Sequence, residues 1–363
     1  MKKVLSTILR WFGIFLVVIV LALAGFIWFG NYHPKPMEAA DVTCPEGTPM
    51  LDSGQGLKVL TWNVQTMSSK NYVFWSDLPN NDGPDEKPSK EDITKTFEET
   101  VRIIQDESPD IIFVQEIDVG AERTYYEDQL ARLTGMLPDY PCYTSVFDWK
   151  SVYVPHPRIH GSVGWKVAIL SKYKITAAER IQLSTAHKSF LEDQFRIQPA
   201  IVKATLPTSN GGQLAALTLH LDLYVSGTNA KDLQLAEIDK QLNELTAAGT
   251  PWILGGDFNL LPFDDAAYAR LAPEQQKYYN PKSEIEFLTN QYQVIPTVEE
   301  VTGPDFAKWL TRWPNDPSIK GPDRTLDYFF LSDDLKIGDH YVRSEDTLYI
   351  SDHLPVIVEF EIP

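Results

Sequence analysis

The sequence has 363 residues, of which 43% are hydrophobic and 12% aromatic, so it can bury a sizeable core and is not of the disordered class. Its formal net charge is −18, and because the first thirty residues carry three basic and no acidic side chains, the remainder carries −21. That sign argues against binding of long nucleic acids, which rests on a basic surface, but it allows a single phosphate to bind at a metal ion.

The first predicted element is an uncharged stretch from Trp11 to Gly30, about as long as a bilayer core is thick. Its basic flank lies on the N-terminal side, so the positive-inside rule predicts a cytoplasmic N-terminus and an extracytoplasmic body. The alternative is a cleaved signal peptide, for which Ala22–Ala24 resembles a cleavage site. We favour an uncleaved anchor because the apolar run continues beyond that site through Phe29. Both alternatives export the body of the chain.

Residues 31–56 are rich in Pro, Gly and acidic side chains and show no periodicity, which predicts a linker. The only two cysteines are Cys44, in this stretch, and Cys142. They could form a disulfide outside the cytosol. Because Cys44 falls in the predicted linker, we expect the two to remain unpaired.

Residues 57–363 alternate between short apolar runs and segments with helical spacing, in a β-rich order that predicts one domain of two packed sheets covered by helices. Strands are expected at 57–64, 110–116, 143–147, 163–171, 197–206, 213–221, 252–254, 326–331, 336–342 and 354–362. Helices are expected at 93–104, 123–133 and 228–245, the last with Thr228 as its N-cap. A polar loop is expected at 68–90, and 261–323 is less regular.

One stretch joins a buried strand to polar side chains: Trp252 to Leu254 is followed by two glycines, Asp257 and Asn259. Glycines permit a tight turn and a close approach of the backbone to a ligand. At strand spacing Asp257 and Asn259 share a face, so they could point into one cleft. The alternative is an Asx turn that ends a strand.

Other apolar strands also carry polar side chains at or near their ends, where burial is costly unless the group is used. Alone, His220 is more often a core histidine and Asp327 a carboxylate that caps a loop. Together, carboxylates, imidazoles and carboxamides are the inventory of a hydrolytic site that uses a hard cation on phosphate. The set comprises Asn63, Glu116, His220, Asp257, Asn259, Asp327, Asp352 and His353.

These residues carry a family resemblance. The order Thr-Trp-Asn63, Gln-Glu116, His220-Leu, Gly-Gly-Asp257-Phe-Asn259, Leu-Asp327-Tyr and Ser-Asp352-His353 resembles the endonuclease/exonuclease/phosphatase superfamily, whose members resemble DNase I. The resemblance covers nearly all of residues 57–363. Lys166 stands where the family commonly has Gly, and Thr218 stands where Asn often precedes the His. These departures leave the subfamily and the substrate open.

The resemblance implies a four-layer α/β/β/α sandwich with the activity of a metal-dependent phosphoesterase. The chain would then divide into a cytoplasmic tip and transmembrane anchor (1–30), a linker (31–56) and a catalytic domain (57–363). Glu116 would be the main ligand of Mg²⁺ (or Mn²⁺), with Asn63 and Asp352 close by or bound through water, in keeping with the few carboxylates that Mg²⁺ takes.

By the same resemblance, His353 would be the acid/base group, oriented by Asp327, since a neighbouring carboxylate fixes an imidazole tautomer. Asp257 would position or activate the attacking water, and Asn259 would donate to the phosphate. His220 would contact a phosphate oxygen or the leaving group. Whether His353 or Asp257 removes the proton is left open.

The substrate is the least specified property. The membrane tether and the acidic charge favour a lipid headgroup or a small phosphoester over polymeric nucleic acid. An extracytoplasmic DNase I-like endonuclease is the alternative, and a non-catalytic metal- or partner-binding relative is disfavoured because all the core residues are present. The aromatics at Tyr72–Trp75 have two interpretations, docking of a substrate or packing against the body. As for reaching a membrane, we expect these aromatics, Trp309 and Trp313 to cover the core instead. The sequence does not specify the oligomeric state.

Overall fold

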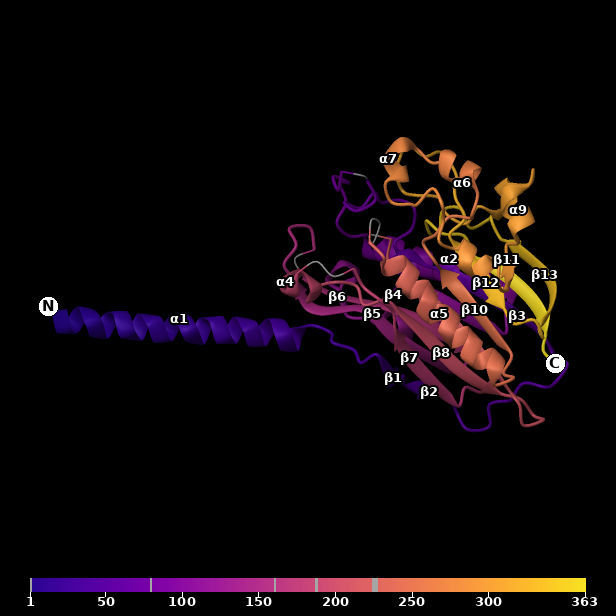
Figure 1. The fold of residues 1–363 in the computed structure, drawn as a ribbon, viewed down its shortest axis with the longest axis horizontal. Coiled ribbons are helices and arrows are strands. Elements are labelled where there is room, and N and C mark those ends of the chain that lie inside the picture. The colour runs from indigo at the N-terminus through magenta and orange to yellow at the C-terminus, as the bar shows by residue number, and fades with distance from the viewer. Residues whose placement is uncertain (1, 79, 160, 187–188, 224–227) are drawn as a thin grey trace.

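A long N-terminal helix projects from a body of two stacked β-sheets (Figure 1). The computed structural model describes residues 2–78, 80–159, 161–186, 189–223 and 228–363. Helix α1 (Lys2–Gly30) is exposed along nearly its whole length. It is long and apolar enough to cross a membrane, a criterion that a signal sequence also meets.

Each sheet has seven strands. The first has the order β13 (Lys336–Val342), β14 (Val356–Glu361), β3 (Gly56–Asn63), β4 (Ile111–Asp118), β6 (Gly161–Ser171), β5 (Cys142–Val154) and β2 (Val42–Thr43). The second has the order β1 (Met37–Ala39), β7 (Ala177–Gln182), β8 (Ala200–Pro207), β9 (Gln213–His220), β10 (Trp252–Asp257), β12 (Asp327–Leu331) and β11 (Gln293–Ile295).

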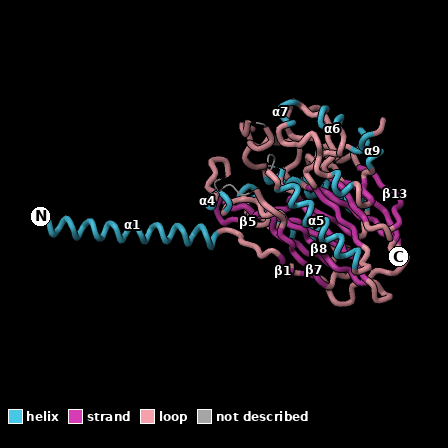
Figure 2. Tube along the Cα trace, in the orientation of Figure 1, coloured by secondary structure: helices cyan, strands magenta, loops and turns pink. Residues whose placement is uncertain are grey.

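Helices cover the outer face of each sheet, which confirms the four-layer α/β/β/α arrangement (Figures 1 and 2). Helices α2 (Lys90–Glu107) and α3 (Gln129–Met136) pack on the first sheet, and α5 (Ala230–Ala247) and α8 (Glu286–Thr289) pack on the second. The connections contain short helices: α4 (Phe190–Asp193), α6 (Asp265–Ala269), α7 (Pro273–Gln276), α9 (Val298–Thr302), η1 (Gln65–Met67), η2 (Glu122–Thr124) and η4 (Phe306–Trp309).

The inner faces of the two sheets form one core, in which Phe113 of β4 meets Phe329 of β12 with ring centroids 6.0 Å apart. Gly255 makes this contact possible, because a Cβ there would lie 2.4 Å from the Phe329 ring. The next residue, Gly256, has φ +152°, and a Cβ there would lie 2.2 Å from the Leu219 carbonyl oxygen. Both glycines therefore serve close backbone packing just before Asp257.

Most of the expected elements are present, but several differ from the prediction. The helix expected at 123–133 is split into η2 and α3 by Tyr125 and Tyr126, whose φ values of +59° and +62° are incompatible with a helix. Strand β7 was not expected, and it pairs with β8 along its whole length. The helix expected from Thr228 begins at Ala230.

The segment 31–56 is not a free linker. Met37–Ala39 pair with β7 of the second sheet, and Val42 and Thr43 pair with Thr144 and Tyr143 of β5 in the first. This antiparallel register places the next residue, Cys44, beside Cys142, and the two form a disulfide. Our expectation of unpaired cysteines is therefore wrong, because strand pairing brings together residues 98 positions apart.

Candidate active site

The predicted site residues converge on one edge of the sandwich, and the strand directions explain why. Strands β3 and β4 are parallel, as are β9 and β10, so Asn63, His220 and Asp257 lie at carboxyl ends that meet at this edge. Strand β12 runs antiparallel to β10 and starts there, which places Asp327 opposite Asp257. Strand β14 is antiparallel to β3, so the preceding loop delivers Asp352 and His353 to the same edge.

Glu116 projects from an interruption in the pairing of β4 with β6, between Val114 and Ile117. Its φ of +57° is unusual for a residue with a side chain, and such strained positions cluster at functional sites. Asn63 Nδ2 donates to Glu116 Oε1 at 3.0 Å and to Asp257 Oδ2 at 3.1 Å. His220 Nε2 lies 3.7 Å and 3.5 Å from the same two oxygens.

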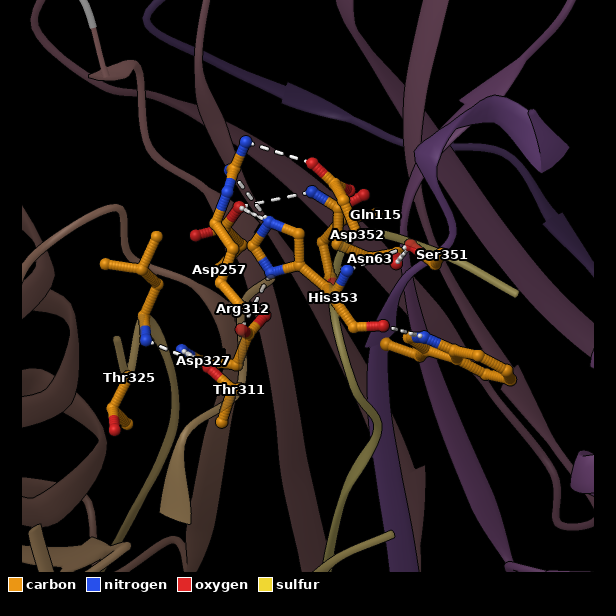
Figure 3. A network of polar contacts seen from close by, with 12 residues as sticks. Asn63, Gln115, Asp257, Thr311, Arg312, Thr325, Asp327, Ser351, Asp352 and His353 are labelled. Carbon is orange, nitrogen blue, oxygen red and sulfur yellow. Dashed lines mark hydrogen bonds and ion pairs between the residues drawn. The ribbon is translucent and has the colours of Figure 1, made fainter. Parts of the chain in front are cut away.

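His353 is held by two buried carboxylates (Figure 3). Its Nδ1 lies 2.8 Å from Asp327 Oδ2, and its Nε2 lies 3.5 Å from Asp257 Oδ2. Burial alone would lower the pKa of His353, but Asp327 and Asp257 raise it to about 9. For Asp257, burial would raise the pKa, but His353, His220 and Arg312 hold it below its ordinary value. An imidazole of raised basicity therefore faces a carboxylate that stays ionised.

Arg312 belongs to the site although the sequence gave no reason to single it out. Its backbone forms an isolated β-bridge with His353. Its Nη1 lies 2.9 Å from His353 Nε2, and its Nη2 lies 2.9 Å from Asp352 Oδ2 (Figure 3). The first contact is a hydrogen bond only when His353 is neutral with its proton on Nδ1, because a guanidinium can only donate. Arg312 thus joins His353, the predicted acid/base group, to Asp352, a predicted metal ligand.

Asn259 is oriented differently from our prediction. Its Nδ2 donates to the Leu221 carbonyl oxygen at 2.8 Å and lies 3.4 Å from Asp257 Oδ2, so both amide hydrogens are directed into the protein. Its Oδ1 is buried and has no hydrogen-bond partner among the described residues. In this orientation Asn259 offers an acceptor rather than a donor.

The residues fit a hard divalent cation. Glu116 and Asp352 both line the cavity, and carboxylate oxygens are the ligands that Mg²⁺ prefers. The buried, unpaired Asn259 Oδ1 is a further oxygen donor at the same cavity. Asn63 is placed to orient Glu116, because its Oδ1 accepts from the Gln65 backbone while its amide donates to Glu116.

A second cluster of potential metal ligands consists of Asp257, Asp327 and His353, whose ligand atoms lie within 4.8 Å of one another. In this cluster His353 Nδ1 is hydrogen-bonded to Asp327, and Nε2 faces the positive charge of Arg312. Both ring nitrogens are therefore engaged. The Glu116 end of the site is the better cation site.

The catalytic edge opens into a cavity of about 670 Å³. Part of its wall is aromatic: Trp149 and Trp165 pack with ring centroids 5.6 Å apart, and Trp75 stacks on His156 at 4.4 Å. The Trp165 ring also lies 5.8 Å from that of His220. Phe74 and Trp75 thus line the cavity, so this loop does more than cover the core. Trp313 packs against Tyr349, whose side chain is exposed.

The two departures from the family pattern lie outside the described cavity lining. Thr218 Oγ1 accepts from Gln115 Nε2 at 3.0 Å, which links β9 to β4 between the sheets. Lys166 Nζ donates to Ser145 Oγ at 3.0 Å, and burial lowers the pKa of this ammonium. Both residues support the framework behind the site.

Comparisons with known proteins agree with this geometry. The model of the Endonuclease/Exonuclease/phosphatase family matches residues 60–353. No curated protein matches.

Solved structures share the fold. An endonuclease/exonuclease/phosphatase from Beutenbergia cavernae DSM 12333 is 19% identical, with a TM-score of 0.57 over 85% of this chain and 72% of that one. The human Nocturnin catalytic domain with bound sulfate anion is 18% identical, with a TM-score of 0.51 over 88% and 96%. A family protein from Leptotrichia buccalis C-1013-b is 17% identical, with a TM-score of 0.52 over 84% and 100%.

Proposed function

Because the chain belongs to the endonuclease/exonuclease/phosphatase family, we propose that it is a Mg²⁺- or Mn²⁺-dependent phosphoesterase anchored in a membrane by α1. Its catalytic domain lies outside the cytoplasm and hydrolyses a lipid headgroup or another small phosphoester. The observation that carries the proposal is the meeting of Glu116, His220, Asp257 and His353 at one sheet edge. That edge opens into a cavity large enough for a small ligand.

A divalent cation held by Glu116 and Asp352 would neutralise charge on the phosphoryl oxygens during in-line attack by water. Asp257 would orient that water, because its ionised Oδ2 lies between the two histidines. His353 would take up or deliver a proton at Nε2, while Asp327 keeps the imidazole oriented through Nδ1. His220, 3.7 Å from Glu116 Oε1, would donate to a phosphoryl oxygen next to the cation.

Two features support an extracytoplasmic domain. The Cys44–Cys142 disulfide suits an oxidising compartment. The basic residues that precede the apolar core of α1 favour a cytoplasmic N-terminus.

Charge supports a small substrate over a polynucleotide. The cationic side chains of the cavity lining each form an ion pair: Lys87 with Glu122, Arg123 with Asp118, Arg158 with Glu86, Arg196 with Asp222, and Arg312 with Asp352. Charges already neutralised in this way offer little attraction to a phosphate backbone.

The test uses the full chain in liposomes, with Mg²⁺ or EDTA, on three substrates: a sphingomyelin or phosphoinositide lipid, a chromogenic phosphodiester and plasmid DNA. We expect Mg²⁺-dependent turnover of the lipid or the chromogenic ester, and a decrease of about 10²–10⁴-fold in His353→Ala. His340→Ala is the control. His340 lies on β13, pairs with Glu300 and does not line the cavity. Near-normal turnover in His353→Ala would contradict the mechanism, and nicking of DNA alone would make the protein an endonuclease.

A further inference from the structure

The C-terminal end of helix α1 meets the outer end of β5. A Cβ on Gly30 would lie 2.6 Å from Val152 Cγ2, and Asn31 forms a β-bridge with Ser151. His33 Nε2 is hydrogen-bonded to Gln194 Oε1 at 2.7 Å, just after α4. The apolar stretch that begins at Trp11 ends at Gly30, so hardly any residues separate a membrane span from the contacts with β5 and α4. If α1 spans a bilayer, this part of the body lies at its surface.

The same part of the body carries exposed apolar side chains. Four of them, which we call the apolar rim, retain large exposed fractions: Val152 (55%), Tyr153 (41%), Phe190 (71%) and Leu191 (60%). The two segments that carry them lie together, because Trp149 Nε1 of β5 donates to the Phe195 carbonyl oxygen at 2.8 Å. In Figure 1, α4 and the ends of β5 and β6 form the part of the body nearest to α1. Exposed apolar clusters of this kind mark interaction surfaces.

The inner sides of these two segments line the cavity. On β5, Trp149 and Val154 face the cavity while Val152 and Tyr153 are exposed. After α4, Phe195 and Ile197 line the same wall. One cavity is therefore lined both by apolar side chains of the segments that carry the apolar rim and by Glu116 and His220 at the catalytic edge. Glu192 and Arg196 are charged side chains of the former segments that also line it.

We propose that the apolar rim dips into the lipid surface that α1 crosses, and that the substrate is a phosphoester lipid of that same membrane, which enters the cavity beside β5 and α4. The surface is assigned to lipid because it is continuous with the end of the apolar helix. The substrate class rests on the proposed phosphoesterase function. The apolar wall would accept the first part of the lipid's chains or backbone while the phosphate reaches the Glu116 end.

Contact of the apolar rim with lipid is tested by a binding measurement that does not depend on enzymatic activity. Leu191→Cys in the full chain is labelled with an environment-sensitive fluorophore and reconstituted into phosphatidylcholine liposomes that contain spin-labelled lipid. The matched control is Val298→Cys on α9, exposed by 41% and at the end of the body remote from α1 (Figure 1). We expect quenching at position 191 at least about twofold stronger than at 298, because an interfacial apolar side chain lies at the headgroup boundary. Equal quenching would overturn the proposal.

The substrate class is tested by the ratio of lipid turnover to turnover of a soluble chromogenic phosphodiester in the same liposomes. A Tyr153→Asp, Leu191→Asp variant should lower this ratio about tenfold, because charges on the apolar rim oppose its entry into the interface. Val298→Asp should leave the ratio unchanged. An unchanged ratio in the rim variant, or turnover of the soluble ester without turnover of lipid, would overturn lipid access while the phosphoesterase function stands. Rim quenching without hydrolysis of either substrate would instead overturn the phosphoesterase function, and with it the lipid substrate.

Discussion

The two ends of the cavity are built from different parts of the fold. At the predicted catalytic end, Glu116, His220 and Asp352 line the cavity. The buried Asp257, Asp327 and His353 lie behind them, at or next to the ends of paired strands. The opposite end consists of the outer part of β5 and the segment after α4, which carry exposed apolar groups as well as the aromatic wall. The comparison indicates that the chemistry depends on the rigid sheets, whereas substrate selection depends on peripheral segments that can vary without disturbing strand pairing. Variants at the first end should therefore change kcat, and variants at the second should change KM.

The largest effect is expected from Glu116→Gln, which removes the main predicted metal carboxylate. Turnover should fall about 10³-fold, since a catalytic metal contributes several kcal/mol and each 1.4 kcal/mol is a factor of ten. The measurement is kcat as a function of Mg²⁺ concentration. Glu122→Gln is the matched control, because Glu122 lines the same cavity but pairs with Lys87. Normal turnover in Glu116→Gln would place the metal elsewhere.

Asp327→Asn should lower kcat about 10²-fold, because Asp327 acts through His353 and the amide no longer fixes the imidazole by charge. Its KM should change little, since Asp327 is buried and is not part of the described cavity lining. A larger change in KM than in kcat would assign Asp327 to substrate binding.

Asp327→Asn should also change how the free energy of unfolding depends on pH. Asp327 and Asp257 raise the pKa of His353 to about 9, compared with about 6.5 in an unfolded chain. In metal-free protein this stabilisation is fully present below pH 6.5 and is lost as the pH rises to about 9. Urea unfolding in detergent at several pH values should show this decline in the parent chain and a flatter profile in Asp327→Asn. Identical profiles would show that Asp327 does not raise the pKa.

A smaller effect is expected from Arg312→Lys. A lysine keeps the charge but has one ammonium, so it cannot place separate nitrogens on both His353 and Asp352 as the guanidinium does. We expect a decrease of about tenfold in kcat, together with a shift in the pH profile of kcat. A lower kcat with an unchanged pH profile would assign Arg312 a purely structural role.

The smallest effect is expected from Trp75→Leu in the aromatic wall. Loss of its stacking on His156 should raise KM for a lipid or an aromatic phosphoester severalfold, as expected for an aromatic pair worth about 0.5–1.5 kcal/mol. The kcat of a small soluble ester should stay the same. Trp313→Leu, which alters a ring packed on Tyr349, is the control. A large decrease in kcat in Trp75→Leu would contradict the inference that the aromatic wall contributes to substrate binding and not to the chemical step.

The sequence was most informative where function follows strand geometry. Polar residues at the ends of apolar strands meet whenever those strands share an edge, so Asn63, His220 and Asp257 could be assigned before the fold was known. Arg312 could not, because it comes from an irregular connection that is placed by isolated bridges to Arg324 and His353. The orientation of Asn259 was also unpredictable, since the Leu221 carbonyl oxygen that fixes it lies 38 residues away.

The disulfide and the position of Trp75 in the aromatic wall of the cavity could not be predicted, for a related reason. The Cys44–Cys142 bond depends on the register of a two-residue strand, which no periodicity in residues 31–56 signals. Similarly, Trp75 faces the cavity because a long loop folds back over the domain to stack on His156. Both features arise from contacts between distant segments, to which composition and local spacing are insensitive.

The place of β14 between β13 and β3 has a consequence for biosynthesis. Asp352 and His353 immediately precede this strand, whereas Asn63, which they must join, is made nearly 300 residues earlier and is linked to Ser351 across 288 positions. A chain emerging from the ribosome or the export machinery folds its earlier parts first. It therefore lacks the predicted acid/base histidine until this late part of the chain has been made. The predicted site would stay incomplete until synthesis of the domain is almost finished.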